Sequence, residues 1–256
     1  MFQKKSLGQN FLKSKKVIAD IVLAGKILVG ETVLEAGPGE GILTEALLAA
    51  GAKVVAEEKD QRLIPMLQHK FSGEIASGQL TLTEGDILNF NPSSFSLEAN
   101  SWKLIANIPY YITGAFIRKF LESENQPSVM VILVQKEVAQ RIVARDKKES
   151  ILSVSVKAYG TPRYIQTVKA GSFSPAPNVD SAILAIENIS KKFFNGFTEE
   201  KFFGVVKTGF AHKRKKLAGN LGVTDAFLVE CAIPKNARAE NLSLEQWRQL
   251  TTFLKK

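Results

Sequence analysis

The sequence contains very few of the residues that form disulfides and metal sites. Its 256 residues include one cysteine, Cys231, and two histidines, His69 and His212. A single cysteine has no partner for an internal disulfide, which is typical of proteins from a reducing compartment. No cysteine or histidine residues have the spacing of zinc ligands. The sequence therefore predicts a protein without internal disulfides and without a bound metal.

Long apolar segments are missing as well. No uninterrupted apolar run reaches the roughly 18 residues that a membrane-spanning helix needs. The basic start of the chain, Met1–Ser6, is not followed by the apolar segment of a secretory signal. We therefore expect a cytoplasmic protein that does not enter a membrane, with a monomer as the default. The length and the 45% hydrophobic content allow a large α/β domain with a small appendage.

Positive charge is concentrated at the two ends of the chain. The net charge is +9, and residues 34–187 carry fifteen Lys and Arg against seventeen acids. Residues 1–33 carry six against two, and residues 188–256 carry thirteen against six. Because the excess flanks a nearly neutral middle, it indicates a polyanion held by both ends over a central site, rather than lysines that only maintain solubility.

The densest cluster of cations is a run of four residues near the C-terminus. It consists of Lys213, Arg214, Lys215 and Lys216. Consecutive cations of this kind suit the phosphates of a nucleic acid.

A glycine-rich turn near the start of the chain is the strongest sign of a small-molecule site. Residues 32–34 are typical of a buried parallel strand, and residues 42–50 of a helix. Gly37, Gly39 and Gly41 stand between them. Glycines let the backbone turn sharply and approach a ligand closely, so the pattern favours a nucleotide-type binding corner. The same spacing also occurs in plain tight turns, so the assignment depends on the strand ends further along the chain.

Acidic residues end the next two predicted strands. The strand over 54–56 runs into Glu57 and Glu58, about twenty positions after the glycine turn, where nucleotide-binding α/β folds place the acid that binds ribose hydroxyls. We assign this role to Glu58, with Glu57 as the competitor. The strand that starts at Leu80 ends at Asp86, which either accepts a hydrogen bond from an exocyclic amine such as that of adenine or closes an Asx turn.

The fourth predicted strand ends in Asn107-Ile108-Pro109-Tyr110, the segment with the most chemistry. Asn107 offers an amide oxygen at the strand end. Pro109 restricts Ile108 to extended geometry and so aims its carbonyl group. Tyr110 supplies a flat face on which a base can stack. The alternative is a strand that a proline terminates beside a buried tyrosine.

These acceptors fit one kind of reaction. The exocyclic nitrogen of adenine is a poor nucleophile because its lone pair is delocalised into the ring. Two acceptors for its hydrogens, the Asn107 side chain and a main-chain carbonyl, would favour a tetrahedral nitrogen and free that lone pair. No strong base is required, and the segment contains none.

The rest of the chain completes an α/β domain and adds a second one. We expect a central strand over 129–134 and three later strands over 151–158, 164–168 and 182–186. Strands joined without long helices predict an antiparallel edge on a parallel sheet. The Pro-rich loop between the last two strands presents Phe173, either as a second stacking ring or as a hydrophobic plug.

The C-terminal part of the chain is expected to be helical. Residues 190–196 form the predicted joint, and residues 198–210 and 242–254 have the apolar spacing of helices. We therefore expect domains over 1–189 and 190–256.

In this order, these segments resemble the KsgA/RsmA family, the small-subunit (16S) ribosomal RNA adenine N6,N6-dimethyltransferases. The resemblance covers nearly the whole chain and implies a Rossmann-like class I S-adenosylmethionine-dependent methyltransferase sheet with a small all-helical C-terminal domain that binds RNA. The segments that carry it are Lys5–Leu12, Glu35–Gly41, Glu58–Asp60, Gly85–Asp86, Asn107–Tyr110, Gln135–Val138, Phe173–Pro177 and Arg238–Ser243.

The resemblance implies S-adenosylmethionine as the methyl donor, without a metal, and it implies a role for each matching residue. The implied cofactor residues are Asn10 and Leu12 closing over the cofactor, Gly37 under its methionine end, Glu58 at the ribose, Asp86 and Ile87 at the adenine, and Asn107 at both donor and target. The implied target is a pair of adjacent adenosines in the 3′-terminal hairpin of small-subunit rRNA, each of which receives two methyl groups during ribosome biogenesis. Tyr110 and Phe173 would bracket the flipped base.

Four places depart from the family pattern. Ala36 replaces a commoner bulky aliphatic residue, and Glu57 stands where an apolar residue is usual. Residues 147–150 lack a frequent Tyr-Gly, and Lys213 replaces a usual arginine. None of these changes removes a catalytic group, whereas the last two affect how the RNA is gripped.

Three other functions compete with this interpretation. The related Erm enzymes methylate one adenine of large-subunit rRNA, and the segments Lys5–Gly8 and Arg238–Leu242 favour the small-subunit enzymes over them. A non-catalytic ribosome assembly factor would not need the intact Asn107–Tyr110 segment. A nicotinamide oxidoreductase fits the glycine turn but neither that segment nor the basic ends of the chain.

Overall fold

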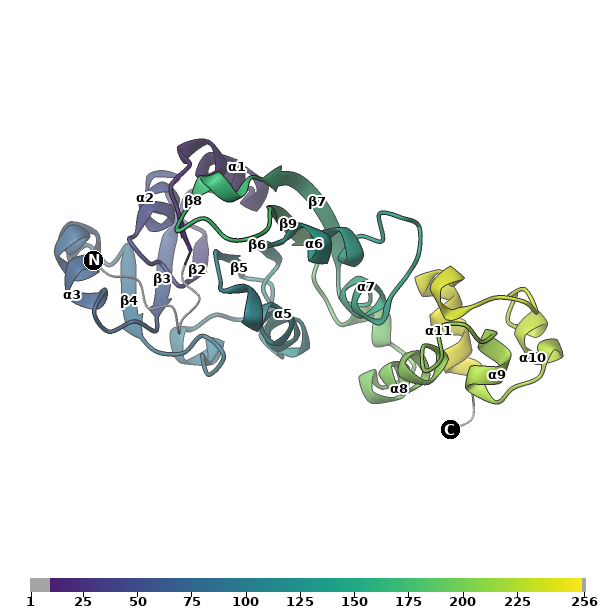
Figure 1. The fold of residues 1–256 in the computed structure, drawn as a ribbon. Coiled ribbons are helices and arrows are strands. Elements are labelled where there is room, and N and C mark those ends of the chain that lie inside the picture. The colour runs from purple at the N-terminus through teal and green to yellow at the C-terminus, as the bar shows by residue number, and fades with distance from the viewer. Residues whose placement is uncertain (1–9, 255–256) are drawn as a thin grey trace. The chain divides into compact units, whose positions relative to one another are not determined.

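The computed structural model describes residues 10–254 and divides into two compact units (Figure 1). The first unit contains the chain up to Ala139 together with Arg163–Ile189, and the second contains Gln140–Pro162 and the chain from Ser190 onward. Residues 1–9 lie outside the described residues. They include the basic start of the chain, Met1–Ser6, and most of the segment Lys5–Leu12. The chain passes between the two units three times.

The first unit is built on a seven-stranded sheet with the order β4-β3-β2-β5-β6-β9-β7. The strands are β2 Thr32–Ala36, β3 Lys53–Glu58, β4 Leu80–Glu84, β5 Trp102–Ala106, β6 Val129–Gln135, β7 Thr161–Val168 and β9 Ser181–Glu187. The neighbouring strands β4, β3, β2, β5 and β6 pair in parallel, and β9 pairs antiparallel with β6. This arrangement confirms the predicted antiparallel edge. The strand order reverses between β2 and β5, and such a reversal is where open α/β sheets bind ligands.

Helices cover both faces of this sheet, so its central strands are buried on both sides and mostly apolar, with Glu35 of β2 and Lys103 of β5 as buried exceptions. The helices are α1 Lys15–Gly25, α2 Ile42–Ala49, α3 Ile64–Lys70, α4 Ser72–Ala76, α5 Thr113–Glu122 and α6 Lys136–Ile142. Helices α1 and α2 pack together over one face, and α5 lies over the other (Figure 1). Every residue of β5 is buried, because the strand lies between these two layers.

A short ribbon fixes the residues that precede α1. Strand β1, Phe11–Leu12, pairs antiparallel with β8, Phe173–Ser174. Leu12 lies opposite Phe173, and both side chains belong to the hydrophobic core of the first unit. The Lys13 amide donates to the Ser172 carbonyl at 2.8 Å and extends the ribbon by one bond.

The second unit is helical. Its helices are α7 Ile151–Lys157, α8 Glu199–Gly209, α9 Leu217–Leu221, α10 Asp225–Glu230 and α11 Leu244–Phe253. Trp247 of α11 is fully buried, and its ring stacks on Phe210 at the end of α8, with ring centroids 5.5 Å apart. Helix α8 begins at the predicted position because the Thr198 side chain accepts a hydrogen bond from the Lys201 amide.

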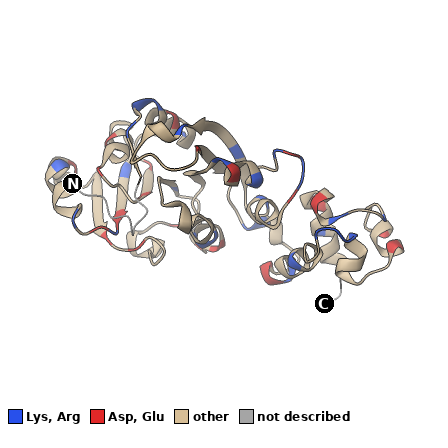
Figure 2. Cartoon of the chain, viewed as in Figure 1, with Lys and Arg blue, Asp and Glu red and all other residues tan. Residues whose placement is uncertain are grey.

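The four cations Lys213–Lys216 lie on the exposed loop between α8 and α9 (Figure 2). The Asn220 side chain holds the start of this loop, because its Nδ2 atom donates to the carbonyls of Gly209 at 2.6 Å and His212 at 3.2 Å. Within the described residues, none of the four cations forms an ion pair with a carboxylate. The predicted phosphate-binding run is thus displayed on an anchored loop.

One predicted strand is wrong, and the error changes the domain boundaries. The sequence predicts extended structure over residues 151–158, but they form α7, which a capping box between Ser150 and Ser153 initiates. Alternating valines are a weak indication of a strand, since strand preference depends on packing. Tyr159, which follows α7, packs its ring 4.9 Å from that of Phe194. Residues 140–162 therefore belong with the C-terminal unit, in contrast to the expected domains of 1–189 and 190–256.

Two glycines of α8 provide a matched test of packing in the second unit. A Cβ atom at Gly209 would overlap the buried ring of Trp247, whereas a Cβ atom at Gly204 on the same helix would meet nothing within 4 Å. We expect Gly209→Ala to lower the free energy of unfolding by about 1–3 kcal/mol, because the core must shift. Gly204→Ala should raise it by about 0.4–1 kcal/mol, because alanine restricts the unfolded chain. Urea unfolding followed by tryptophan fluorescence measures both, and equal effects would contradict the packing described.

Candidate active site

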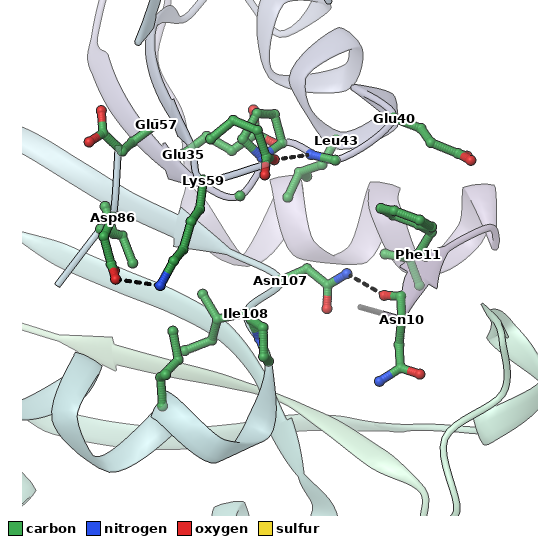
Figure 3. Close-up of a pocket in the computed structure, with 18 of the residues that line it drawn as sticks. Asn10, Phe11, Glu35, Glu40, Leu43, Glu57, Lys59, Asp86, Asn107 and Ile108 are labelled. Atoms are coloured by element: carbon green, nitrogen blue, oxygen red, sulfur yellow. Dashed lines mark hydrogen bonds and ion pairs between the residues drawn. The ribbon is translucent and has the colours of Figure 1, made fainter. Parts of the chain in front are cut away.

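A single cavity collects almost all of the residues that the sequence singled out (Figure 3). Its walls come from β1, from the glycine turn after β2, and from the segments that follow β3, β4 and β5. The predicted residues that line it are Asn10, Leu12, Gly37, Glu58, Asp86, Ile87, Asn107, Ile108, Pro109 and Tyr110. Phe173 is not among the lining residues.

The glycine turn needs glycine for a reason of conformation and a reason of space. Gly37, Gly39 and Gly41 all have positive φ angles, of 69°, 60° and 75°. A Cβ atom at Gly39 would lie 3.0 Å from the ring of Phe11, and one at Gly41 would lie 2.6 Å from the buried ring of Phe71. The turn can therefore bring its backbone close to a ligand in the cavity, which residues of β1 also line.

Glu58 joins the glycine turn to β3. Its Oε2 atom accepts from the Gly39 amide at 3.0 Å, and its Oε1 atom accepts from the Asp60 amide at 2.8 Å. The side chain is buried, and this burial raises the pKa of its carboxyl group despite these two bonds. The predicted ribose acid is thus held in one orientation at the wall of the cavity.

Two departures from the family pattern lie side by side. Ala36 on β2 and Glu57 on β3 are neighbours in the register of the sheet, so their side chains share one face. The buried Glu57 carboxylate accepts a hydrogen bond from the Thr83 hydroxyl and lies against Gly85, where it leaves no room for a Cβ atom. The small Ala36 thus accompanies a long buried acid, whose carboxylate occupies the space beside Gly85.

Asp86 forms the Asx turn that was one of its two expected roles, and it also lines the cavity. Its Oδ1 atom accepts from the Leu88 amide at 3.0 Å, and its Oδ2 atom accepts from the Lys59 ammonium at 2.6 Å (Figure 3). The Lys59 ammonium holds the pKa of the Asp86 carboxyl below its usual range, with help from the Leu88 amide. Sequence reasoning missed Lys59, although its position directly after Glu58 could have drawn attention to it.

The amide nitrogen of Asn107 is already engaged within the protein. The Nδ2 atom donates to the Asn10 carbonyl at 3.2 Å, which leaves Oδ1 to accept from a ligand (Figure 3). Tyr110 is half-buried and shares a hydrogen bond with the hydroxyl of Ser181. Burial raises the pKa of the Tyr110 hydroxyl, so this group is neutral at physiological pH and is no base.

Phe173 has the structural role that the sequence offered as an alternative. Its side chain is only 5% exposed and lies in the core, opposite Leu12. Stacking on a base would require the ring to be uncovered. Tyr111, which sequence reasoning did not assign, lines the cavity and is 67% exposed.

Glu35 is the third residue of the cavity, after Lys59 and Tyr111, that sequence reasoning left without a role. It lines the cavity, is 1% exposed, and neither of its carboxylate oxygens has a hydrogen-bond partner. Burial raises the pKa of the Glu35 carboxyl to about 8, against an opposing effect of the nearby Thr44 hydroxyl and with smaller contributions from Glu58, which raises the pKa, and Lys70, which lowers it. An acid inside an otherwise apolar strand was the available signal.

Within residues 10–254, no group of three His, Cys, Asp or Glu side chains is placed to hold a metal ion. None of the helices in this range is long and apolar enough to cross a membrane.

The raised pKa of Glu35 predicts a pH-dependent stability. The folded protein binds the Glu35 proton more tightly than the unfolded chain does, so wild-type stability decreases as the pH rises from 4.5 to about 8. Glu35→Gln carries no charge and avoids this loss. We expect it to exceed wild type in free energy of unfolding by on the order of 1–4 kcal/mol near pH 9 and by much less near pH 5.

Denaturant unfolding at both pH values measures this difference. Glu45→Gln serves as the control, since Glu45 lies on the adjacent helix α2 with a 67% exposed side chain. A difference between Glu35→Gln and wild type that does not change with pH would show that Glu35 does not titrate in this range.

Comparison with known proteins agrees with this geometry. Residues 2–256 match the family described as ribosomal RNA adenine dimethylase. Two similar proteins, from Dehalococcoides mccartyi and Lactobacillus johnsonii, are both named ribosomal RNA small subunit methyltransferase A. The first is 40% identical over 255 residues, which cover 96% of this chain and 87% of the relative. The second is 38% identical and covers 100% of this chain and 92% of its own.

Solved structures show the same fold over nearly the whole chain. The 23S rRNA methyltransferase ErmE has a TM-score of 0.79 at 27% identity, covering 94% of this chain and 98% of its own. A dimethyladenosine transferase from Plasmodium falciparum has a TM-score of 0.78 at 25% identity, and the match covers 94% of this chain and 95% of its own. With an S-adenosylmethionine-dependent methyltransferase fold, a family match over almost every residue and relatives up to 40% identical, this chain belongs to the ribosomal RNA adenine dimethylase family.

Proposed function

We propose that this protein is an S-adenosylmethionine-dependent rRNA adenine N6,N6-dimethyltransferase. It transfers methyl groups to two adjacent adenosines in the 3′-terminal hairpin of small-subunit rRNA during ribosome biogenesis. The observation that carries this proposal is the position of Asn107–Tyr110 at the wall of the cavity, opposite the glycine turn and beside Asn10. A protein that only binds RNA would not need an amide oxygen and an aromatic ring placed there.

The residues of the cavity fit S-adenosylmethionine, which supplies an electrophilic methyl group on a sulfonium when bound. Gly37 and Gly39 line the cavity with positive φ angles, and nothing lies within 4 Å of a Cβ position at Gly37, so the turn offers its backbone to a ligand. The unpartnered carboxylate of Glu35 suits the cationic methionine end, near Gly37. Glu58 would bind the ribose hydroxyls, while the residues after β4 would contact the adenine. Asn10 and Leu12 would close over the cofactor from β1.

Methyl transfer then needs a target nitrogen with a free lone pair. The Asn107 Oδ1 atom accepts one hydrogen of the adenine amine, and a main-chain carbonyl of the same segment accepts the other. This pairing favours a tetrahedral nitrogen, whose lone pair points away from the two acceptors. Tyr110 stacks on the base and keeps it out of its helix, as base-modifying enzymes require. Once methylated, the nitrogen is cationic and loses its proton to water without a dedicated base.

The second unit contributes the phosphate contacts. The four cations Lys213–Lys216 are exposed on a loop that Asn220 anchors, and they lack carboxylate partners within the described residues. Cations of this kind position a nucleic acid without reading its sequence.

The large-subunit alternative is less well supported. ErmE has the same fold, but its identity of 27% is below the 38–40% of the relatives named for the small subunit. A non-catalytic assembly factor remains the alternative of another class, and the intact Asn107–Tyr110 segment argues against it.

Labelled methyl transfer tests the proposed function. The purified protein is incubated with labelled S-adenosylmethionine and undermethylated small ribosomal subunits, with large subunits and their naked rRNA in parallel, and the labelled bases are mapped. Dimethyladenosine at adjacent positions near the small-subunit 3′ end supports the proposal. Label in large-subunit rRNA assigns the protein to the Erm type, and cofactor binding without label in either RNA supports an assembly factor.

Removal of the Asn107 amide should separate catalysis from binding. We expect Asn107→Ala to lower the methylation rate by at least about a hundredfold, because the hydrogen bond that activates the nitrogen is lost. RNA affinity should change by less than about threefold, since the basic loop is intact. Single-turnover rates and filter binding measure the two effects. Asn125→Ala, which loses only a hydrogen bond to Ser93, is the control, and undiminished turnover in Asn107→Ala would exclude the mechanism.

Neutralising the basic loop should weaken RNA binding and its salt dependence. With Lys213, Arg214, Lys215 and Lys216 all changed to Gln, we expect the slope of log affinity against log salt to fall in magnitude by about 2–3, because each phosphate contact releases a counterion. The control changes Lys157 and Lys191 to Gln, since their ammonium groups already pair with Glu149 and Glu199. An unchanged slope in the loop variant would remove this loop from the RNA interface.

A further inference from the structure

Lys59 makes a contact in the cavity that the proposed mechanism leaves unexplained. Its side chain extends from the end of β3 across to Asp86, which follows β4, and its ammonium group meets the Asp86 Oδ2 atom at 2.6 Å (Figure 3). Both residues line the cavity, with side-chain exposures of 55% and 29%. The pair thus forms part of the wall where the adenine of the cofactor is expected.

The three acids next to Lys59 in the chain, Glu57, Glu58 and Asp60, have their own partners. Glu58 accepts two backbone amides, and Glu57 accepts the Thr83 hydroxyl. Asp60 pairs with Arg62. Lys59 is therefore committed to Asp86 and is not a counterion shared among the acids around it. Within the described residues, it is the cation that pairs with Asp86.

The contact fixes what Asp86 can offer to a purine. The Leu88 amide occupies one oxygen and Lys59 the other, and each carboxylate oxygen keeps a second lone pair. A carboxylate held between two donors stays ionised, so it can only accept hydrogen bonds. The 6-amino group of adenine donates, and it fits such a site. The 6-oxo group of a hypoxanthine presents an acceptor at the same position, and two acceptors repel each other.

We propose that Lys59 is a positioning residue that makes the cofactor site selective for a 6-aminopurine over a 6-oxopurine, by holding Asp86 as a fixed acceptor. This inference rests on the proposed function, in which S-adenosylmethionine binds in this cavity. Without Lys59, the Asp86 side chain could turn away or take up a proton and donate to a 6-oxo group. Selectivity would then fall although the Asp86 side chain is still present.

Binding of two nucleosides tests the proposal on the full-length protein. S-adenosylhomocysteine and S-inosylhomocysteine differ in the 6-substituent, and isothermal titration calorimetry gives the affinity ratio for each variant. We expect Lys59→Met, which keeps the length of the side chain without its charge, to lower the adenosyl-to-inosyl ratio by at least about tenfold, mainly through weaker adenosyl binding. Lys59→Arg restores a cation and should return the ratio to within about threefold of wild type.

The matched control is Lys53→Met, since Lys53 is an exposed lysine at the opposite end of the same strand. It should leave the ratio unchanged. Because Lys59 is more than half exposed, its variants should melt at the wild-type temperature, which thermal unfolding checks.

The outcomes separate this inference from the function on which it rests. A wild-type protein that prefers the adenosyl compound, with the same ratio in Lys59→Met, overturns the role of Lys59 alone. Tighter adenosyl binding by Lys59→Met would overturn it too, because Lys59 would then compete with the purine. A wild-type protein that binds neither compound overturns the cofactor assignment, and the inference falls with it.

Discussion

The hydrogen bond from the Gly39 amide to the Glu58 carboxylate connects two walls of the cavity, the glycine turn and the end of β3. Gly39 belongs to the turn after β2, and Glu58 ends β3, so this bond fixes the distance between the turn and the neighbouring strand end. The Asp60 amide holds the other carboxylate oxygen. The turn has positive φ angles at Gly37, Gly39 and Gly41, and in this conformation the Gly39 amide is directed at the carboxylate. The predicted ribose acid is therefore also a structural residue, and a change there would disturb the turn as well as a ligand.

Much of this arrangement can be predicted from the sequence, because the ends of strands can be recognised from their residue types. An apolar run that stops at a glycine, an acid or an Asn-x-Pro marks the carboxyl edge of a parallel sheet, and such edges meet in space. For this reason the sequence alone places Gly37, Glu58, Asp86 and Asn107 together, and all four line one cavity. The resemblance to a family added Asn10 and Leu12, which no periodicity would have selected.

The errors arise where packing overrides local preference. The valines after Ile151 alternate as in a strand, yet a capping box begins α7 and the helix packs within the second unit. Phe173 occurs in a loop sequence that predicts exposure, but pairing of β8 with β1 buries it. Lys59 was missed because a lysine among acidic residues is usually exposed to solvent. Only the strand register brings it next to Asp86. The contacts of Phe173 and Lys59 join segments that are remote in sequence.

The three passages of the chain between the units have a consequence for how this protein can be divided. Residues 140–162 leave the first unit, contribute α7 to the second, and return before β7 and β9 complete the sheet. Backbone bonds from Glu149 to Glu240 and from Ser190 to Tyr159 tie this excursion to the C-terminal residues. Neither unit is thus a continuous stretch of chain. A fragment ending at Ile189 would carry α7 without α8, and the ring of Tyr159 would lose Phe194. Recombination that exchanges the helical unit between relatives must therefore move two separate segments together.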